Sequence, residues 1–168
     1  MKKIGILSDT HGIDDDNIAR HFADVDEIWH AGDIGDIETY KRISAMAPVF
    51  RAVAGNIDGA VLRRVCPELL IFETEGLKVV MTHIGGYPGK YAPGILKVLQ
   101  QERPKIFVSG HSHILRVMHD DSLDLLHINP GAAGVHGWQK VRSLVRLTLD
   151  NGTPKDLEII HLSPLRQF

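Results

Sequence analysis

Residues 4–12 read Ile-Gly-Ile-Leu-Ser-Asp-Thr-His-Gly and join a short apolar run to two side chains of the kind that bind metals. The run at 4–7 predicts a β-strand, and the polar residues and glycine after it predict a tight loop that carries Asp9 and His11. Three aspartates follow at 14–16, where the start of a helix favours negative charge. This segment therefore predicts a strand, a loop that bears ligands, and a helix.

The same unit recurs farther along the chain. Residues 27–30 are a predicted strand, 32–36 a turn, and 38–46 a helix that ends before a proline. A third predicted strand at 49–53 runs into Gly-Asn-Ile-Asp-Gly at 55–59. The first third of the chain is thus predicted as βαβαβ, with a metal-binding side chain after every strand.

Short β-type runs dominate the rest of the chain. The sequence predicts a hairpin from 69–72 and 77–81, a helix at 93–101, and a strand at 106–109 that leads directly into Gly-His-Ser-His. Further strands are expected at 115–118, 123–128, 143–149 and 157–162. So many strands and so few helices predict an α/β fold of two packed sheets with helices outside, a four-layer αββα sandwich.

Length and charge limit what such a fold can bind. The 168 residues, 43% of them hydrophobic, suit one domain over residues 1–168, with no second domain to form a lid. The 19 basic and 21 acidic residues nearly balance, which predicts no nucleic-acid surface and no membrane-binding surface, because these need clustered lysine and arginine. A small or extended anionic substrate stays open as a partner, and so does a homo-oligomer.

The compartment follows from the cysteine content and the N-terminus. Cys66 is the only cysteine, so no disulfide can form within the chain, and its setting predicts a buried small hydrophobe in a reducing compartment. The Met-Lys-Lys start resembles a signal peptide, but Ser8 and Asp9 interrupt the apolar run at once. No other stretch has the length to cross a bilayer. We therefore expect a cytoplasmic protein.

Candidate metal ligands stand at the loop after each of several apolar runs. They are Asp9, His11, Asp33, Asn56, His83, His111 and His113. Imidazole nitrogen with carboxylate or amide oxygen, and no thiolate, suits Mn²⁺, Fe, Co²⁺ or Zn²⁺ in a catalytic site. On an extended backbone, Asp-x-His and His-x-His would each place both members on one side of the chain. Each pair could then bind one metal together or place one ligand on each of two metals.

The charge of such a centre indicates its substrate. Two divalent ions carry four positive charges, and two carboxylates (Asp33 shared, Asp9 the other) with a bridging hydroxide remove three, which leaves +1. A net positive centre favours an anionic substrate and stabilises the charge that develops on phosphoryl oxygens during displacement. Asn56 fits this balance, because a neutral amide ligand adds no further negative charge.

Five motifs in order give the sequence a family resemblance. They are Asp9-x-His11, Gly32-Asp33, Gly55-Asn56-x-Asp58, Thr82-His83 and Gly110-His111-Ser112-His113. Together they resemble the calcineurin-like metallophosphoesterase superfamily, in particular its small single-domain bacterial and archaeal phosphodiesterases. The resemblance implies a two-sheet sandwich and two divalent ions, manganese first, with iron, cobalt, nickel or zinc as other candidates. It also implies one metal held by Asp9, His11, Asp33 and His113, and another held by Asp33, Asn56, His83 and His111, with Asp33 as the bridge.

This resemblance predicts a phosphodiesterase that acts on a small phosphoester through in-line attack by a metal-bridging hydroxide. Ile57 stands where many larger relatives have a histidine that protonates the leaving group, so we expect a preference for esters with good leaving groups. The glycine-rich loop at 85–94, with Tyr87, Lys90 and Tyr91, is the expected substrate contact, because it directly follows a ligand.

The remaining polar residues of interest receive supporting roles. His30 is expected to support the centre or fill the core rather than bind metal, and Asp58 to cap or orient its own loop. His136 lies in a glycine-containing loop that could approach the metals as a substrate or proton-transfer group. The other histidines are expected to be structural or solvated: His21, His119, His127 and His161. Arg51 and Arg116 could meet phosphate but fit solvated strand-edge charges better.

Two other functions compete with the enzyme. One is a non-catalytic metal-binding scaffold of the same fold, like the retromer subunit that resembles this family, but such a scaffold can lose ligands and this chain has all seven. The other is a nucleotide-binding doubly wound domain. That reading lacks its glycine fingerprint, because Ser-Asp-Thr-His-Gly occupies the loop after the first strand.

Overall fold

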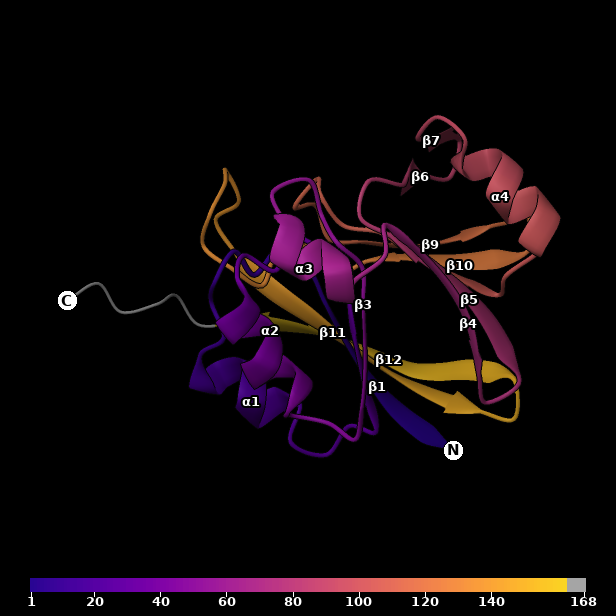
Figure 1. The fold of residues 1–168 in the computed structure, drawn as a ribbon. Helices are drawn as coiled ribbons and strands as arrows, with labels where there is room; N and C mark the ends of the chain where they lie inside the picture. The colour runs from indigo at the N-terminus through magenta and orange to yellow at the C-terminus, as the bar shows by residue number, and fades with distance from the viewer. Residues whose placement is uncertain (163–168) are drawn as a thin grey trace.

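Two five-stranded mixed sheets face each other in the computed structural model, which describes residues 1–162 (Figure 1). The first sheet has the order β12-β11-β1-β2-β3, with bounds β1 Lys2–Leu7, β2 Glu27–His30, β3 Val49–Ala52, β11 Arg142–Asp150 and β12 Thr153–Leu162. The second sheet has the order β4-β5-β8-β10-β9, with bounds β4 Leu69–Thr74, β5 Leu77–Thr82, β8 Ile106–Val108, β9 Arg116–Asp120 and β10 Leu125–Asn129. The last six residues of the predicted domain, 163–168, lie outside the described residues.

Helices cover the outer face of each sheet, and Figure 1 shows α1, α2 and α3 on one side of the molecule and α4 on the other. Their bounds are α1 Asp16–His21, α2 Ile37–Ser44, α3 Ala60–Val65 and α4 Ile95–Glu102. Ile18 of α1 and Ile43 of α2 are buried in one apolar cluster with strand residues of the first sheet. Leu99 of α4 is buried with Val80 and Phe107 of the second sheet. The four-layer αββα sandwich predicted from the sequence is confirmed.

A continuous apolar core lies between the sheets. Alternate residues of facing strands supply it, for example Ile4 and Ile6 of β1 and Val79 and Met81 of β5, all fully buried. This alternation follows from the two-residue period of a strand, which sends every second side chain to the same face. The outward neighbours of these residues then pack under the helices.

The parallel strands bring several loops to one edge of the sandwich. β1, β2 and β3 run parallel in one sheet, and β5, β8 and β10 run parallel in the other. Their carboxyl ends therefore point the same way within each sheet, which is where sites form in open α/β sheets. The Asp9 amide donates to the Gly32 carbonyl at 2.9 Å, and the Gly110 amide donates to the His83 carbonyl at 2.9 Å. These bonds join neighbouring loops within each sheet.

Three short elements were not predicted. α3 was not predicted because it has only six residues, its N-cap residue Gly59 provides no side-chain cap, and Val61 and Val65 are exposed. The two-residue strands β6 Gly86–Tyr87 and β7 Lys90–Tyr91 form a small hairpin inside the loop at 85–94. Two residues are too few to show a periodic pattern. Among residues 1–162, no helix combines the length and apolar character needed to cross a bilayer.

Candidate metal centre

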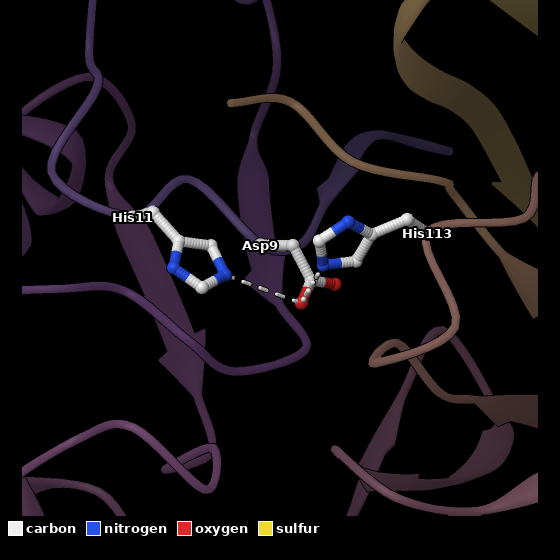
Figure 2. A group of neighbouring side chains, drawn as sticks. All are labelled: Asp9, His11 and His113. Carbon is white, nitrogen blue, oxygen red and sulfur yellow. Dashed lines mark hydrogen bonds and ion pairs between the residues drawn. The ribbon is translucent and has the colours of Figure 1, made fainter. Parts of the chain in front are cut away.

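Asp9, His11 and His113 form the first of two donor groups (Figure 2). Asp9 and His11 follow β1, whereas His113 comes from the loop between β8 and β9. The Asp9 Oδ1 atom lies 3.1 Å from His113 Nε2 and 3.8 Å from His11 Nε2. The other oxygen, Oδ2, accepts hydrogen bonds from the Ser8 hydroxyl at 2.6 Å and the His111 amide at 3.1 Å. Oδ1 is therefore the oxygen that Asp9 can offer to a cation.

Asp33, His83 and His111 form the second donor group. Asp33 follows β2, His83 follows β5, and His111 follows β8, so this group joins the two sheets. His83 Nε2 lies 3.2 Å from Asp33 Oδ2. Asn56, from the loop after β3, places its Oδ1 atom 3.0 Å from His111 Nδ1. All seven residues singled out in the sequence thus converge on one region.

The Asp33 carboxylate lies between the two groups. Its Oδ2 atom is 3.2 Å from His83 Nε2 in the second group and 3.4 Å from His11 Nε2 in the first. Its Oδ1 atom accepts a hydrogen bond from the Ile57 amide at 3.1 Å, which fixes the carboxylate in place. Oδ2 is therefore placed where one oxygen could serve two cations.

Two buried histidine nitrogens in this centre have no hydrogen-bond partner among residues 1–162. They are His11 Nε2 and His83 Nε2. The other ring nitrogen of His83, Nδ1, lies 2.7 Å from the Ala31 carbonyl oxygen, which can only accept, so Nδ1 carries the proton. Burial alone would lower the pKa of His83, but Asp33 and Asp9 outweigh it and raise the pKa, so Nε2 presents a lone pair toward Asp33 once the ring is neutral. Buried nitrogens without partners are uncommon, and a lone pair beside carboxylates suits a divalent cation.

Gln139 orients the ring of His113 as the Ala31 carbonyl orients that of His83. Nothing in the sequence indicated this role for Gln139. The Gln139 amide group donates to the carbonyls of Gly134 at 3.3 Å and His136 at 2.7 Å, so its Oε1 faces His113 Nδ1 at 2.7 Å. This arrangement puts the proton on Nδ1 and leaves Nε2 for the centre. A single glutamine in a loop carries no pattern that could have identified it.

The loops of the centre have an unusual backbone. Five of the seven candidate ligands have positive φ: Asp9 at 55°, His11 at 46°, Asp33 at 55°, His111 at 69° and His113 at 62°. The expectation that the two histidine-containing pairs lie on extended backbone is therefore wrong. Left-handed conformations turn the chain sharply, so Asp9 and His11 enter the same group whereas His111 and His113 enter different ones.

Supporting groups hold these turns in place. Asp58 is buried and accepts hydrogen bonds from the amides of Ile34, Gly35 and Gly55, so it joins the Asp33 loop to the Asn56 loop as expected. At Gly55 a Cβ atom would overlap the Asp33 carboxylate and amide. Only glycine fits this close approach.

His30 also supports the Asp33 turn, as predicted. Its Nδ1 accepts from the Gly32 amide at 3.1 Å, and its Nε2 lies 2.9 Å from the Thr10 hydroxyl. Complete burial lowers the pKa of His30 to about 4, so the ring is neutral at pH 7.

His136 approaches the centre from the loop after β10. Its ring stacks on that of His11, with centroids 4.7 Å apart and planes 24° from parallel, and the residue is exposed. His127 is buried, whereas His119 and His161 are exposed and His21 is partly buried. None of these four belongs to either donor group.

The centre favours positive charge even without metal. Burial alone would raise the pKa of the Asp9 carboxyl, but the neighbouring rings of His11, His113 and His83 and the Ser8 hydroxyl outweigh it and hold the pKa well below its usual value. Burial likewise opposes the lowered pKa of Asp33, which the contact with His83 produces. Two charged carboxylates and four imidazole rings form a donor set that suits divalent metals of the manganese-to-zinc series.

The chain is similar to known proteins in both sequence and fold. The model of the calcineurin-like phosphoesterase superfamily domain matches residues 1–152. A probable metallophosphoesterase of Mycoplasma pneumoniae is 31% identical over 164 residues, which cover 94% of this chain and 96% of the relative. The crystal structure of Vps29 from Entamoeba histolytica in complex with Zn²⁺ has a TM-score of 0.70 at 17% identity, covering 95% of this chain and 98% of the other. The structure of an archaeal phosphodiesterase has a TM-score of 0.74 at 24% identity, with 95% and 99% covered.

Proposed function

Because this chain belongs to the calcineurin-like phosphoesterase superfamily, we propose that it is a phosphodiesterase that depends on two divalent metal ions. The observation that carries the proposal is the position of Asp33 Oδ2 between two donor groups that each contain a buried histidine nitrogen without a partner among residues 1–162. The archaeal phosphodiesterase of the same fold supports the choice of a diester.

Each donor group would hold one ion. Asp9, His11 and His113 would bind the first, His83 and His111 with Asn56 would bind the second, and Asp33 would contribute to both. When bound, such ions supply a nucleophilic hydroxide near neutral pH and neutralise charge on phosphoryl oxygens. The donor set holds nitrogen and oxygen and no sulfur, which suits the manganese-to-zinc series, and we place manganese first because the family resemblance implies it.

The protein's own residues prepare the site for this chemistry. The Ala31 carbonyl and Gln139 keep a proton on Nδ1 of His83 and His113, so each ring turns its Nε2 atom toward the centre. Asn56 and His111 are exposed, so an ester can approach the second group from solvent. Ile57 is 46% exposed beside Asn56 and offers no proton to a leaving group. Esters with good leaving groups should therefore be the better substrates.

Hydrolysis of bis-p-nitrophenyl phosphate tests the proposal. We expect Mn²⁺ to stimulate turnover and EDTA to abolish it, and His83→Ala to lower kcat/KM by about a hundredfold or more. His119→Ala is the matched control, because His119 is exposed and lies outside both donor groups. Full turnover in EDTA, or in the His83→Ala protein, would refute the metal-dependent mechanism.

A metal-binding scaffold without catalysis is the second candidate, and the likeness of the fold to zinc-bound Vps29 favours it. The two candidates differ in one measurement. A scaffold would bind metal at the expected stoichiometry yet cleave the ester no faster than its own His83→Ala variant. The complete ligand set leads us to rank the enzyme first.

A further inference from the structure

A second feature adjoins the donor groups. A pocket of about 340 Å³ opens beside His111, between the β6–β7 hairpin and the start of β9. Its side walls come from Ile84, Tyr87, Lys90, Tyr91, Pro93, His111, Ser112, Ile114, Arg116, His127 and Asn129. The lining contains two cationic side chains, Lys90 and Arg116, and no carboxylate. A pocket with this lining attracts anions.

Arg116 is oriented for binding rather than paired. Its guanidinium carbon lies 4.0 Å above the centre of the Tyr87 ring, so the planar group rests on the hairpin. Among residues 1–162 it forms no ion pair with a carboxylate, in contrast to Arg51, which binds Glu27 at 3.1 Å. A guanidinium held flat on an aromatic ring keeps its N–H edge free for two parallel hydrogen bonds to a phosphate or carboxylate.

His127 adds no charge to this pocket. It is fully buried, and its Nε2 lies 3.0 Å from the Ser109 hydroxyl. Burial, reinforced by the nearby Arg116 charge, lowers the pKa of His127 to about 4, so the ring is neutral at pH 7. Apart from the candidate ligand His111, the pocket therefore owes its charge to Arg116 and the exposed Lys90.

The pocket is continuous with one side of the metal centre and unlike the other side. His111 belongs to the second donor group and also lines this pocket. A different pocket, of about 360 Å³, adjoins His113; it is walled mainly by apolar groups such as Leu115, Trp138 and Val141, with Lys140 in its lining and, among residues 1–162, no arginine. A phosphodiester bound at the centre would thus have the pocket with Arg116 and Lys90 on one side and a more apolar pocket on the other.

We propose that the pocket beside His111 binds a second anionic group of the substrate, so that the preferred substrates are phosphodiesters that carry a further phosphate. This inference rests on the proposed function, because it assigns the first phosphate to the metal centre. Arg116 would provide the bidentate contact, Lys90 a second charge, and Tyr87 would hold the guanidinium in position.

Thymidine nucleotides that differ by one phosphate test the inference in the Mn²⁺-loaded protein. Calorimetry would compare the Kd of thymidine 3′,5′-bisphosphate with that of thymidine 5′-monophosphate. Kinetics would compare kcat/KM for the p-nitrophenyl ester of thymidine 5′-phosphate with and without a 3′-phosphate. We expect the second phosphate to improve both quantities by about tenfold, as for a hydrogen bond between charged groups.

Variants locate the preference. Arg116→Gln should remove the advantage of the second phosphate, and Lys90→Gln, a change at an exposed residue that does not threaten folding, should reduce it. Arg20→Gln is the matched control, because it removes an exposed arginine of α1 that lines no part of the pocket, and it should keep the full advantage.

The outcomes separate the two proposals. The inference would be overturned if Kd and kcat/KM of the wild type were equal with and without the second phosphate, or if the advantage were undiminished in Arg116→Gln. Cleavage of the esters in the same experiment would still support the proposed function. Preferential binding of the bisphosphate without cleavage of any ester would overturn the proposed function and support the pocket.

Discussion

The two ends of strand β2 treat buried acids in opposite ways. At its start, Glu27 is 1% exposed and accepts four hydrogen bonds: Oε1 from Lys2 and Thr74, and Oε2 from Trp29 and Arg51. Just past its end, Asp33 is 2% exposed, adopts positive φ, and points one oxygen at two histidine nitrogens that have no hydrogen-bond partner among residues 1–162.

This difference separates a region of the fold that serves stability, around Glu27, from a region that is suited to binding, around Asp33. A buried carboxylate whose acceptor sites are all used stabilises the native state, because the folded form lowers its pKa. Buried ring nitrogens without hydrogen-bond partners are unfavourable, and left-handed backbone costs about 1 kcal/mol or more per residue. Both persist only where the surrounding structure holds them. The second arrangement leaves ring nitrogens and one carboxylate oxygen free for a ligand.

The largest expected effect comes from Asp33→Asn, which removes the charge of the shared ligand but keeps an acceptor for the Ile57 amide. We expect kcat/KM with Mn²⁺ to fall by about a thousandfold. Without metal, the free energy of unfolding should change by about 1 kcal/mol or less, because the lost contact with His83 is partly offset by relief of the cost of burying a charge and, to a smaller extent, of repulsion from Asp9.

Asp36→Asn is the control, because Asp36 lies in the same loop and caps α2 by accepting from the Thr39 amide. Asparagine caps helices as well as aspartate does, so activity should change by less than about twofold. Substantial activity in Asp33→Asn would show that the Asp33 end of β2 does not carry the metal-dependent function.

The next effect concerns the close packing at the metal end. In Gly55→Ala the new methyl group would overlap the Asp33 carboxylate and amide, so the loop must shift. We expect about a hundredfold loss of kcat/KM and a loss of about 1–3 kcal/mol in the free energy of unfolding.

Gly59→Ala is the matched change at the start of α3. A Cβ atom there would meet nothing within 4 Å, so activity and stability should stay near the wild-type values. Equal effects of the two substitutions would show that the glycine contact with Asp33 is unimportant.

At the other end of β2 we expect a change in stability and none in catalysis. Burial alone would raise the pKa of Glu27, but hydrogen bonds from Trp29 and Lys2 outweigh it and lower the pKa to about 2. Its stabilising effect is therefore complete above the unfolded pKa of about 4.5 and is lost as the pH falls from there through about 2.

Glu27→Gln should accordingly lower the free energy of unfolding by about 2 kcal/mol at pH 7 and flatten its dependence on pH below 4.5, with kcat/KM unchanged. Denaturant unfolding at several pH values measures this. Glu73→Gln, an exposed change on β4, should move stability by about 0.5 kcal/mol or less. A fall in kcat/KM in Glu27→Gln would mean that the two ends are not independent.

The smallest effect is expected at Gln139, which positions His113 through Nδ1. Gln139→Ala should weaken Mn²⁺ affinity by about tenfold through loss of this orientation, with KM for the ester little changed once metal is saturating. Gln100→Ala, at an exposed residue of α4, is the control for metal titration. Unaltered Mn²⁺ affinity in Gln139→Ala would show that the ring of His113 is held by other contacts.

Local sequence predicted the fold, and the place of the candidate ligands after strands, because each element and each candidate residue lies next to its own signal. Asp33 follows the strand-forming run at 27–30 and stands between Gly32 and Gly35, so its place after a strand is visible without the rest of the chain. The strands of the two large sheets and the helices α1, α2 and α4 were placed for the same reason. α1 is no longer than α3, but aspartates at 14–16 mark its start, whereas Gly59 gives α3 no side-chain cap.

Relations between distant residues could not be predicted in this way. The orientation of Asp33 Oδ2 between His11 and His83 depends on left-handed backbone, which the sequence alone did not indicate. The stacking of Arg116 on Tyr87 joins residues from two elements whose contact only the folded chain creates. That histidines and acids would gather was thus predictable, but which atom faces which was not.

Anomalous diffraction from crystals of this protein grown with Mn²⁺ would show whether two ions share Asp33. Two peaks are predicted, one among Asp9, His11 and His113 and one among Asn56, His83 and His111, with Asp33 bound to both and ions about 3.5–4 Å apart. A single peak, or two peaks that do not share Asp33, would contradict the account.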